Sequence, residues 1–218
     1  TRRLLANISW VGSFNGGDGQ SWNNPLNWST DTVPGPGDHV GIHDSGAGDP
    51  VISSHVEIAS IFITHGLEID NGSLITTGDF AVDMAGVQLK NGSLLRVGGE
   101  TFTADGGISI GSPGDTEPSR LEFFGDFNGF NGEGGIVFSE GSILDTTDVS
   151  SPYVSLSRVH FVQATIENNP NTRFSGSDSY FYDLTTTGPI RFGGVKISGD
   201  FNLGGSLTFD STEPKGRI

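Results

Sequence analysis

Cysteine is absent from this chain of 218 residues, so it can form neither a disulfide nor a thiolate metal site. Basic residues are scarce, because 11 Lys and Arg stand against 26 Asp and Glu and give a net charge of −15. A surface of this charge repels nucleic acid and anionic membranes. No apolar run approaches the roughly 20 residues that a membrane span needs. We therefore expect no nucleic-acid partner and no membrane span.

Helical periodicity is also missing, since no stretch repeats its apolar residues at helical spacing over several turns. Only 33% of the residues are hydrophobic, whereas 34 are glycine. This composition is typical of many short strands that are separated by frequent corners and that enclose a thin core. The length is sufficient for one domain.

A repeated phrase organises the middle of the chain. Residues 67–74 read LEIDNGSL, and residues 87–94 read VQLKNGSL, about 20 residues later. In both copies the alternation of apolar and polar residues predicts a strand with one buried face. Asn-Gly tolerates positive φ and predicts a corner. A strand and corner that recur at a fixed step indicate a β-solenoid; the alternative is that these dipeptides are ordinary turns of another β protein.

All three tryptophans precede the repeats, at Trp10, Trp22 and Trp28. A repeat stack needs a cap at its end, and large aromatic rings can cover the open core there. The alternative is that the three rings form a platform that binds sugar. The sequence leaves both interpretations open.

The N-terminal region resembles a known kind of exported protein. The matching segments are Arg2 to Ala6 and an ordered series of Trp10-Val11-Gly12, Ser21-Trp22, Asn27-Trp28-Ser29, Val33 to Asp38 and Val40-Gly41-Ile42. This order is similar to the W-x-G, W, N-W-S, V-P-x-x-G-D opening of large secreted, planctomycete-type bacterial surface and autotransporter-like proteins. The resemblance implies a right-handed parallel β-helix on an exported protein, and it implies no particular activity.

Together these patterns predict an all-β chain with a single right-handed parallel β-helix (β-solenoid) and an N-terminal Trp-rich cap. We expect a strand and the cap in residues 1–37, the β-helix in 38–210 and an exit segment in 211–218. Residues 112–119 should form an exposed insertion between coils. The side chains that should be buried are Leu67, Ile69, Val82, Met84, Val87, Leu89, Ile108, Ile110, Ile136, Phe138, Val195 and Ile197.

Catalytic residues are not apparent in the sequence. A glycosidase needs two carboxylates at a set separation, and the chain has no Asp-Asp pair. A lyase needs a base beside metal-binding acids, but the few Lys and Arg do not cluster along the chain. Asp70 and Lys90 should be neighbours on adjacent coils, where a cross-strand ion pair explains them. We therefore expect that the protein is not an enzyme.

His39 and His43 share one face of a predicted strand, and Asp44 follows them. Two imidazoles and a carboxylate suit a metal ion, but no third side-chain ligand beyond them is identifiable, and exposed histidines on a strand are ordinary. The acidic surface could hold Ca²⁺, although the sequence contains no calcium-binding motif. We therefore expect no cofactor, with these three residues as the weak candidates for a metal site.

The favoured function is that of an extracellular structural or adhesive protein, a building block of a surface layer, stalk or filament. The apolar N-terminal strand, with Leu4, Leu5 and Ile8, or the capped end that follows it, could dock on the last coil of another copy. Packing of these three residues within their own chain is the alternative. A carbohydrate-binding module, with an extracellular polysaccharide as partner, and a polysaccharide-degrading enzyme are the other functions that we weigh.

Overall fold

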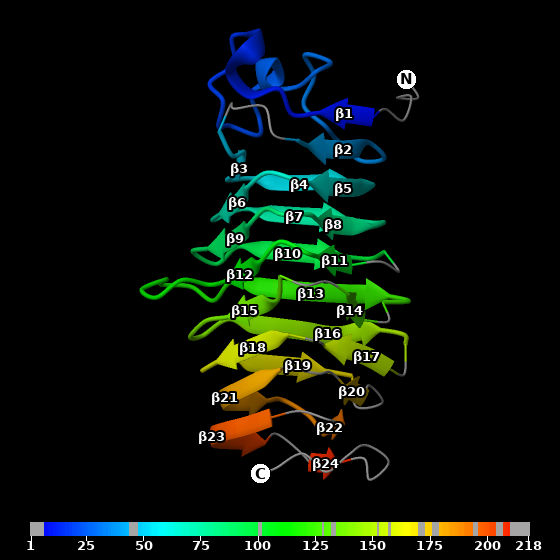
Figure 1. The fold of residues 1–218 in the computed structure, drawn as a ribbon, viewed down its shortest axis with the longest axis vertical. Coiled ribbons are helices and arrows are strands. Elements are labelled where there is room, and N and C mark those ends of the chain that lie inside the picture. The colour runs from blue at the N-terminus through cyan, green and yellow to red at the C-terminus, as the bar shows by residue number, and fades with distance from the viewer. Residues whose placement is uncertain are drawn as a thin grey trace.

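The computed structural model of the protein describes residues 7–43, 48–99, 102–127, 129–131, 134–151, 153–156, 158–169, 173–175, 179–193, 196–203 and 207–209. Within them the chain winds into a β-solenoid, in which the strands of each coil lie beneath those of the coil before (Figure 1). All strand pairs between coils are parallel, for example β6 with β9 and β9 with β12. The predicted parallel β-helix is therefore confirmed.

Three stacks of strands form the faces of the helix. The first stack contains β1 (Asn7–Ser9), β2 (His39–Ile42), β5 (Ser60–Ile63), β8 (Phe80–Val82), β11 (Phe102–Ala104), β14 (Gly129–Asn131), β17 (Tyr153–Leu156), β20 (Arg173–Ser175), β22 (Ile190–Gly193) and β24 (Leu207–Phe209). The second contains β3 (Val51–Ile52), β6 (Leu67–Asp70), β9 (Val87–Lys90), β12 (Ile108–Ile110), β15 (Ile136–Phe138) and β18 (Val159–Val162). The third contains β4 (His55–Ile58), β7 (Ser73–Thr76), β10 (Leu94–Val97), β13 (Arg120–Gly125), β16 (Ile143–Val149) and β19 (Thr165–Asn168). Two long strands, β21 (Tyr180–Thr186) and β23 (Lys196–Leu203), continue both the second and the third stack.

The predicted repeat sets the register of the second stack. Leu67 lies opposite Val87, and Val87 lies opposite Ile108, so these steps keep close to the expected length of about 20 residues. The step from Ile108 to Ile136 is longer because it contains residues 112–119, which form a mostly exposed loop as predicted. In Figure 1 this loop projects from the rod between β12 and β13.

The corners use the residues that the repeat predicts. Asn71 and Asn91 both have a left-handed backbone, with φ of 51° and 53°, and Gly92 follows with φ of 75°. Asparagine and glycine adopt this conformation at low cost. Each corner therefore redirects the chain from the second stack to the third without strain from a bulky side chain.

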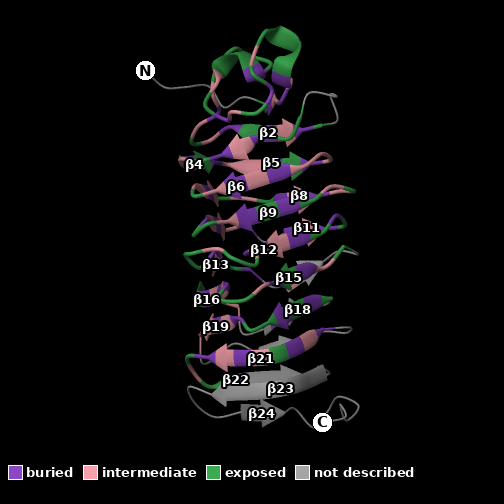
Figure 2. Ribbon diagram, turned by 90° about the vertical axis from the view of Figure 1, so that its left-hand side faces the viewer, coloured by how far each residue is buried: buried purple, intermediate pink, exposed green. Residues whose placement is uncertain are grey.

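The core lies inside the three stacks, and buried residues alternate with more exposed ones along most of the strands whose burial is described (Figure 2). Phenylalanine rings of successive coils stack on one another there. The centroids of Phe138 and Phe161 are 4.6 Å apart, and those of Phe161 and Phe181 are 5.0 Å apart. A second group joins Phe80 to Phe102 at 5.2 Å. Stacking of identical positions between coils thus fills the interior with aromatic area.

The predicted burial is confirmed for nine of the side chains, which are at most 2% exposed, namely Leu67, Ile69, Val82, Val87, Leu89, Ile108, Ile110, Ile136 and Phe138. Met84 is an error, because it is 85% exposed. It lies in the corner after β8 with φ of 57°, so the alternation that predicts its burial ends before it. Val195 and the side chain of Ile197 lie outside the described residues.

Candidate functional site

The N-terminal cap is built around the three tryptophans. The Trp28 ring lies 4.9 Å from Trp10 and 4.6 Å from Trp22, in edge-to-face geometry in both cases. All three side chains are at most 3% exposed. Trp28 Nε1 donates to the carbonyl of Trp22 at 2.8 Å, and Trp10 Nε1 donates to that of Gly48 at 3.2 Å. The rings close the N-terminal end of the core, and their burial leaves no ring face on which a sugar could stack.

Asn27 and Asp18 fix the loops over this cap. Asn27 is fully buried, and its Nδ2 donates to Asp18 Oδ1 at 2.7 Å and to the Ser21 carbonyl at 2.8 Å. The bond from Asn27 above all, together with the backbone N–H groups of Gln20 and Ser21, holds the pKa of Asp18 well below its usual range. The carboxylate is therefore ionised at neutral pH and accepts these hydrogen bonds.

The predicted metal ligands are partly outside the described residues. Asp44 is one of these, so its position relative to the two histidines is not described. His39 is exposed, and its Nδ1 lies 2.7 Å from Ser60 Oγ. The His43 ring lies 5.8 Å from that of Phe62. In the described part of the chain, no group of three His, Cys, Asp or Glu side chains is placed to hold a metal ion.

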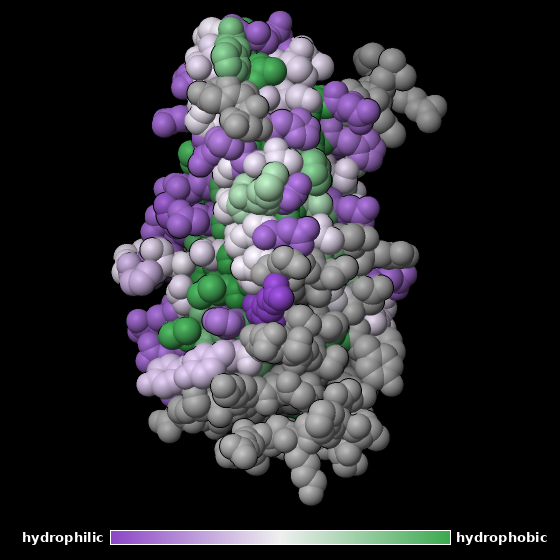
Figure 3. Space-filling view, in the orientation of Figure 1, coloured by the Kyte–Doolittle hydropathy of each residue, from purple (hydrophilic) through white to green (hydrophobic). Residues whose placement is uncertain are grey.

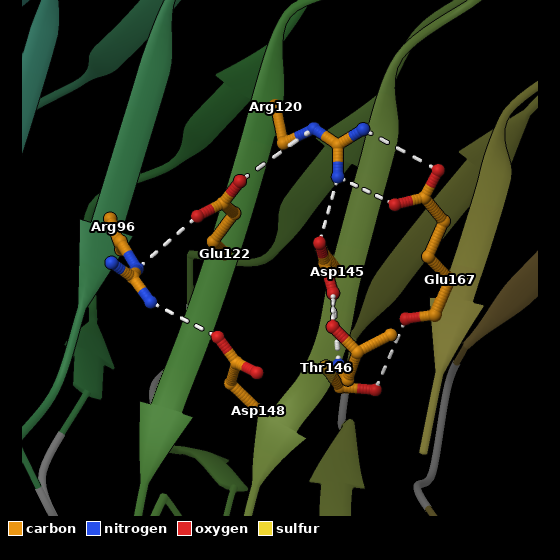
Figure 4. A network of polar contacts seen from close by, with 8 residues as sticks. Arg96, Arg120, Glu122, Asp145, Thr146, Asp148 and Glu167 are labelled. Carbon is orange, nitrogen blue, oxygen red and sulfur yellow. Dashed lines mark hydrogen bonds and ion pairs between the residues drawn. The ribbon is translucent and has the colours of Figure 1, made fainter. Parts of the chain in front are cut away.

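A cluster of charged residues crosses the outer face of the third stack (Figure 4). At its centre, Arg120 on β13 donates to Asp145 on β16 at 2.7 Å and to Glu167 on β19 at 2.6 Å. Burial disfavours the charge of Arg120, but the hydrogen bond and the attraction of Glu167, and that of Asp145, outweigh it and raise the pKa of Arg120. One guanidinium thus connects three successive coils.

Arg96 on β10 extends this charged ladder toward the N-terminus. It lies 3.3 Å from Glu122 on β13 and 3.1 Å from Asp148 on β16, and its guanidinium lies 4.6 Å above the Phe124 ring. Burial first, and then repulsion from Asp145, raise the pKa of Glu122 in spite of the two arginines. The ladder holds four coils together from outside, which is a role in stability.

No sequence motif indicates this charged ladder, because its members are far apart along the chain. The basic residues do not cluster along the chain, but in space Arg96 and Arg120 lie on neighbouring strands in the same network. Leu94 pairs with Arg120, so β10 and β13 align only when the inserted loop 112–119 is left out of the repeat. The residues of this ladder can be identified from the register between coils, but not from their spacing in the sequence.

The predicted pair of Asp70 and Lys90 is correct in register, because their Cα atoms are partners in β6 and β9. The ion pair itself differs, since Lys90 Nζ lies 2.7 Å from Glu68, one position along the same face. Asp70 instead accepts a hydrogen bond from Asn91 Nδ2 at 2.7 Å. The long Lys90 side chain pairs with its diagonal neighbour Glu68, which leaves the Asp70 carboxylate to Asn91.

Of the residues predicted to mediate assembly, Leu4 and Leu5 lie outside the described residues. Ile8 is 2% exposed and belongs to β1, which pairs in parallel with β2 of the same chain through Ile8 and Val40. The strand β1 therefore packs on its own chain, which was the alternative to donation between copies.

Comparison of the chain with family models, with curated proteins and with solved structures finds no match. The β-solenoid rests on the geometry alone, and the resemblance to exported bacterial proteins stays a prediction. Among the described residues, no helix has the length and apolar character that crossing a membrane requires.

Proposed function

We propose that this protein is an extracellular structural or adhesive element, a unit of a surface layer, stalk or filament that assembles end to end. The arrangement of strands supports this proposal. Each coil packs on the coils before and after it, and β1 and β24 lie near opposite ends of the rod (Figure 1). A rod with two different ends can join other copies by a repeated head-to-tail contact, which gives an open filament unless the rotation closes it into a ring.

The observation that carries the proposal is the surface of the capped end. Two short 3₁₀ helices form it, η1 (Gly12–Asn15) and η2 (Pro25–Asn27). Each presents a large apolar side chain to solvent, with Phe14 71% exposed and Leu26 42% exposed. Hydrophobic atoms are visible at the surface of the cap in Figure 3. Burying the exposed part of these side chains at a contact would stabilise it by up to about 2 kcal/mol for Phe14 and by about 1 kcal/mol for Leu26.

Because β1 is already paired within its own chain, the contact that we propose uses the cap rather than a donated strand. The partner surface is the C-terminal region of the next copy. The role requires no catalysis, and we place the protein outside the cell because of the resemblance of its N-terminal segments. Incubation with neutral and acidic polysaccharides should release neither reducing ends nor unsaturated products.

The test compares a pair of substitutions in the cap with a pair on the side of the rod. Phe14→Ser with Leu26→Ser removes the apolar groups of the cap, whereas Val137→Ser with Val162→Ser removes exposed apolar groups from the side of the rod. Light scattering over a range of concentrations and electron microscopy should show end-to-end assemblies of the natural chain and of the side variant. The cap variant should stay monomeric with unchanged melting. A natural chain that is monomeric at high concentration, or a cap variant that assembles as well, contradicts the proposal.

A further inference from the structure

A shallow depression lies on the outer face of the first stack, where β1, β2, β5 and β8 run side by side. Its volume is about 390 Å³. It is distinct from the apolar surface of the cap that the proposed assembly uses and from the charged ladder on the third stack. Three features of its lining indicate a ligand: an exposed ring, small residues beside that ring, and a column of polar groups.

The exposed ring is that of Phe62 on β5, which is 43% exposed although β5 has a paired strand on each side. Its partners on the neighbouring strands are Gly41 on β2 and Ala81 on β8. Neither partner has a side chain large enough to cover the ring, so the Phe62 side chain projects above the residues beside it. An aromatic side chain in this setting offers a broad apolar surface to a flat ligand.

The second ring of the site belongs to His43. It is tilted by 51° against Phe62, with the centroids 5.8 Å apart. It also lies over Gly41, since a Cβ at that position would come within 2.6 Å of His43 Nε2. Glycine is therefore required where the imidazole folds onto the sheet, and the two rings together form one wall of the depression.

The polar groups form a column on the same face of these strands, two residues before Phe62 and Gly41. Asn7, His39 and Ser60 are partners in register, and Asp79 lines the same depression next to β8. His39 Nδ1 and Ser60 Oγ are 2.7 Å apart, which fixes the imidazole. The column offers amide, imidazole, hydroxyl and carboxylate groups, so it contains both donors and acceptors.

From this arrangement we infer that the depression binds an uncharged glycan, one or two sugar units at a time. A pyranose ring has an apolar face that fits Phe62 and His43, and hydroxyl groups at its edge that fit the polar column. Small-molecule sites commonly combine apolar walls with a few convergent polar groups in this way. Acidic sugars are disfavoured, since Asp79 lines the site and the whole chain carries a net charge of −15.

The inference rests on the proposed adhesive function and gives it a ligand: the face of the rod would attach to a neutral polysaccharide while the cap joins copies. The two roles use different surfaces, so each can fail without the other.

The experiment measures binding of defined oligosaccharides by calorimetry and on a glycan array. The probes are tetrasaccharides of glucose, mannose, galactose and N-acetylglucosamine, with tetrasaccharides of uronic acid as the charged comparison. We expect binding of at least one neutral probe at millimolar concentration or below, and none of the uronic acid probes. Absence of binding to every neutral probe, or a preference for the acidic ones, overturns the inference.

Variants locate the site once a neutral probe binds. Phe62→Ala removes the main ring and should weaken binding about tenfold, whereas Phe62→Tyr should restore it. Ala81→Thr keeps the ring but fills the floor beside it, so it should weaken binding while the strand stays well formed. Val137→Ala, an exposed apolar side chain on the second stack, is the matched control and should change nothing.

Unchanged binding in Phe62→Ala and Ala81→Thr, with melting curves like that of the natural chain, overturns the assignment of the site. The same measurement on the monomeric cap variant separates this inference from the proposed function. Binding that persists in that variant shows that the site works without assembly.

Discussion

Leu89→Ala tests the register on which the whole fold depends. Leu89 is completely buried in β9, and its partners on the neighbouring coils, Ile69 and Ile110, are also 0% exposed. Truncation to alanine removes apolar contacts and leaves a cavity that the paired strands cannot close. A loss of about 2–5 kcal/mol is expected for such a change. The side chain of Lys90, the next residue, points outward, and Lys90→Ala removes a partly exposed ion pair worth about 0.2–1 kcal/mol.

The assay is hydrogen exchange measured by mass spectrometry, because each coil of a solenoid depends on its neighbours and the rod need not unfold in one step. Leu89→Ala should speed exchange in β6, β9 and β12 before it affects β18 and β21. Lys90→Ala should leave all of these near their original rates. Equal loss of protection in the two variants would show that the strand is shifted by one residue, because such a shift exchanges its inner and outer faces.

Three further outcomes follow from particular contacts. Gly17→Ala should lower stability and loosen the cap, seen as a shift of Trp fluorescence, because its Cβ would come within 1.9 Å of Asn27 Oδ1; unchanged fluorescence and melting would contradict this. Glu122→Gln should gain stability relative to the natural chain as the pH rises above 4.5, because the folded state raises the pKa of this carboxyl and its ionisation then disfavours folding; denaturation from pH 4 to 8 checks the sign, and a difference that falls with pH refutes it. Met84→Asn should stabilise the corner by about 1 kcal/mol, since asparagine adopts the left-handed backbone more readily, and a lower melting temperature would count against that reasoning.

The inner faces and the corners of the regular coils could be predicted from the sequence. Alternation in residues 67–70 and 87–90 fixes which side chains point inward, because a strand has a period of two. Asn-Gly marks where each strand ends. These patterns are local, so they can be recognised without knowing which residues of neighbouring coils are in contact.

Corners that lack such residues could not be found. The apolar residues from Val56 to Ile63 follow one another without a turn residue, yet they form β4 and β5 on two different faces, with Ala59 between them. Alanine does not indicate a turn, and the apolar residues on both sides of it have the pattern of one continuous strand. The turn is imposed by pairing with the next coil, where Gly78 N donates to the Ala59 carbonyl at 2.7 Å.

The candidate sites depend on the same missing information. Phe62 and His43 are apolar or aromatic residues in a strand pattern, and only the partners Gly41 and Ala81 show that the Phe62 ring is uncovered. Arg96 and Arg120 likewise can be placed in one network only when the inserted residues 112–119 between their strands are left out of the repeat. Sequence patterns predict the inside of each coil, whereas the outer surface is assembled from several coils whose alignment the sequence does not state.

The insertion at 112–119 explains why that alignment is so hard to read. It lengthens one coil, yet Leu95 still pairs with Leu121, and Arg120 N still donates to the Ser93 carbonyl at 2.8 Å. Within the loop, Asp115 accepts from Ser112 N at 2.9 Å, so the extra residues close on themselves. The corner absorbs the change in length because loop closure depends only weakly on length, whereas a shift in register would expose the core. Coil length in this fold is therefore free to vary, and the columns of side chains on its outer faces stay aligned in spite of it.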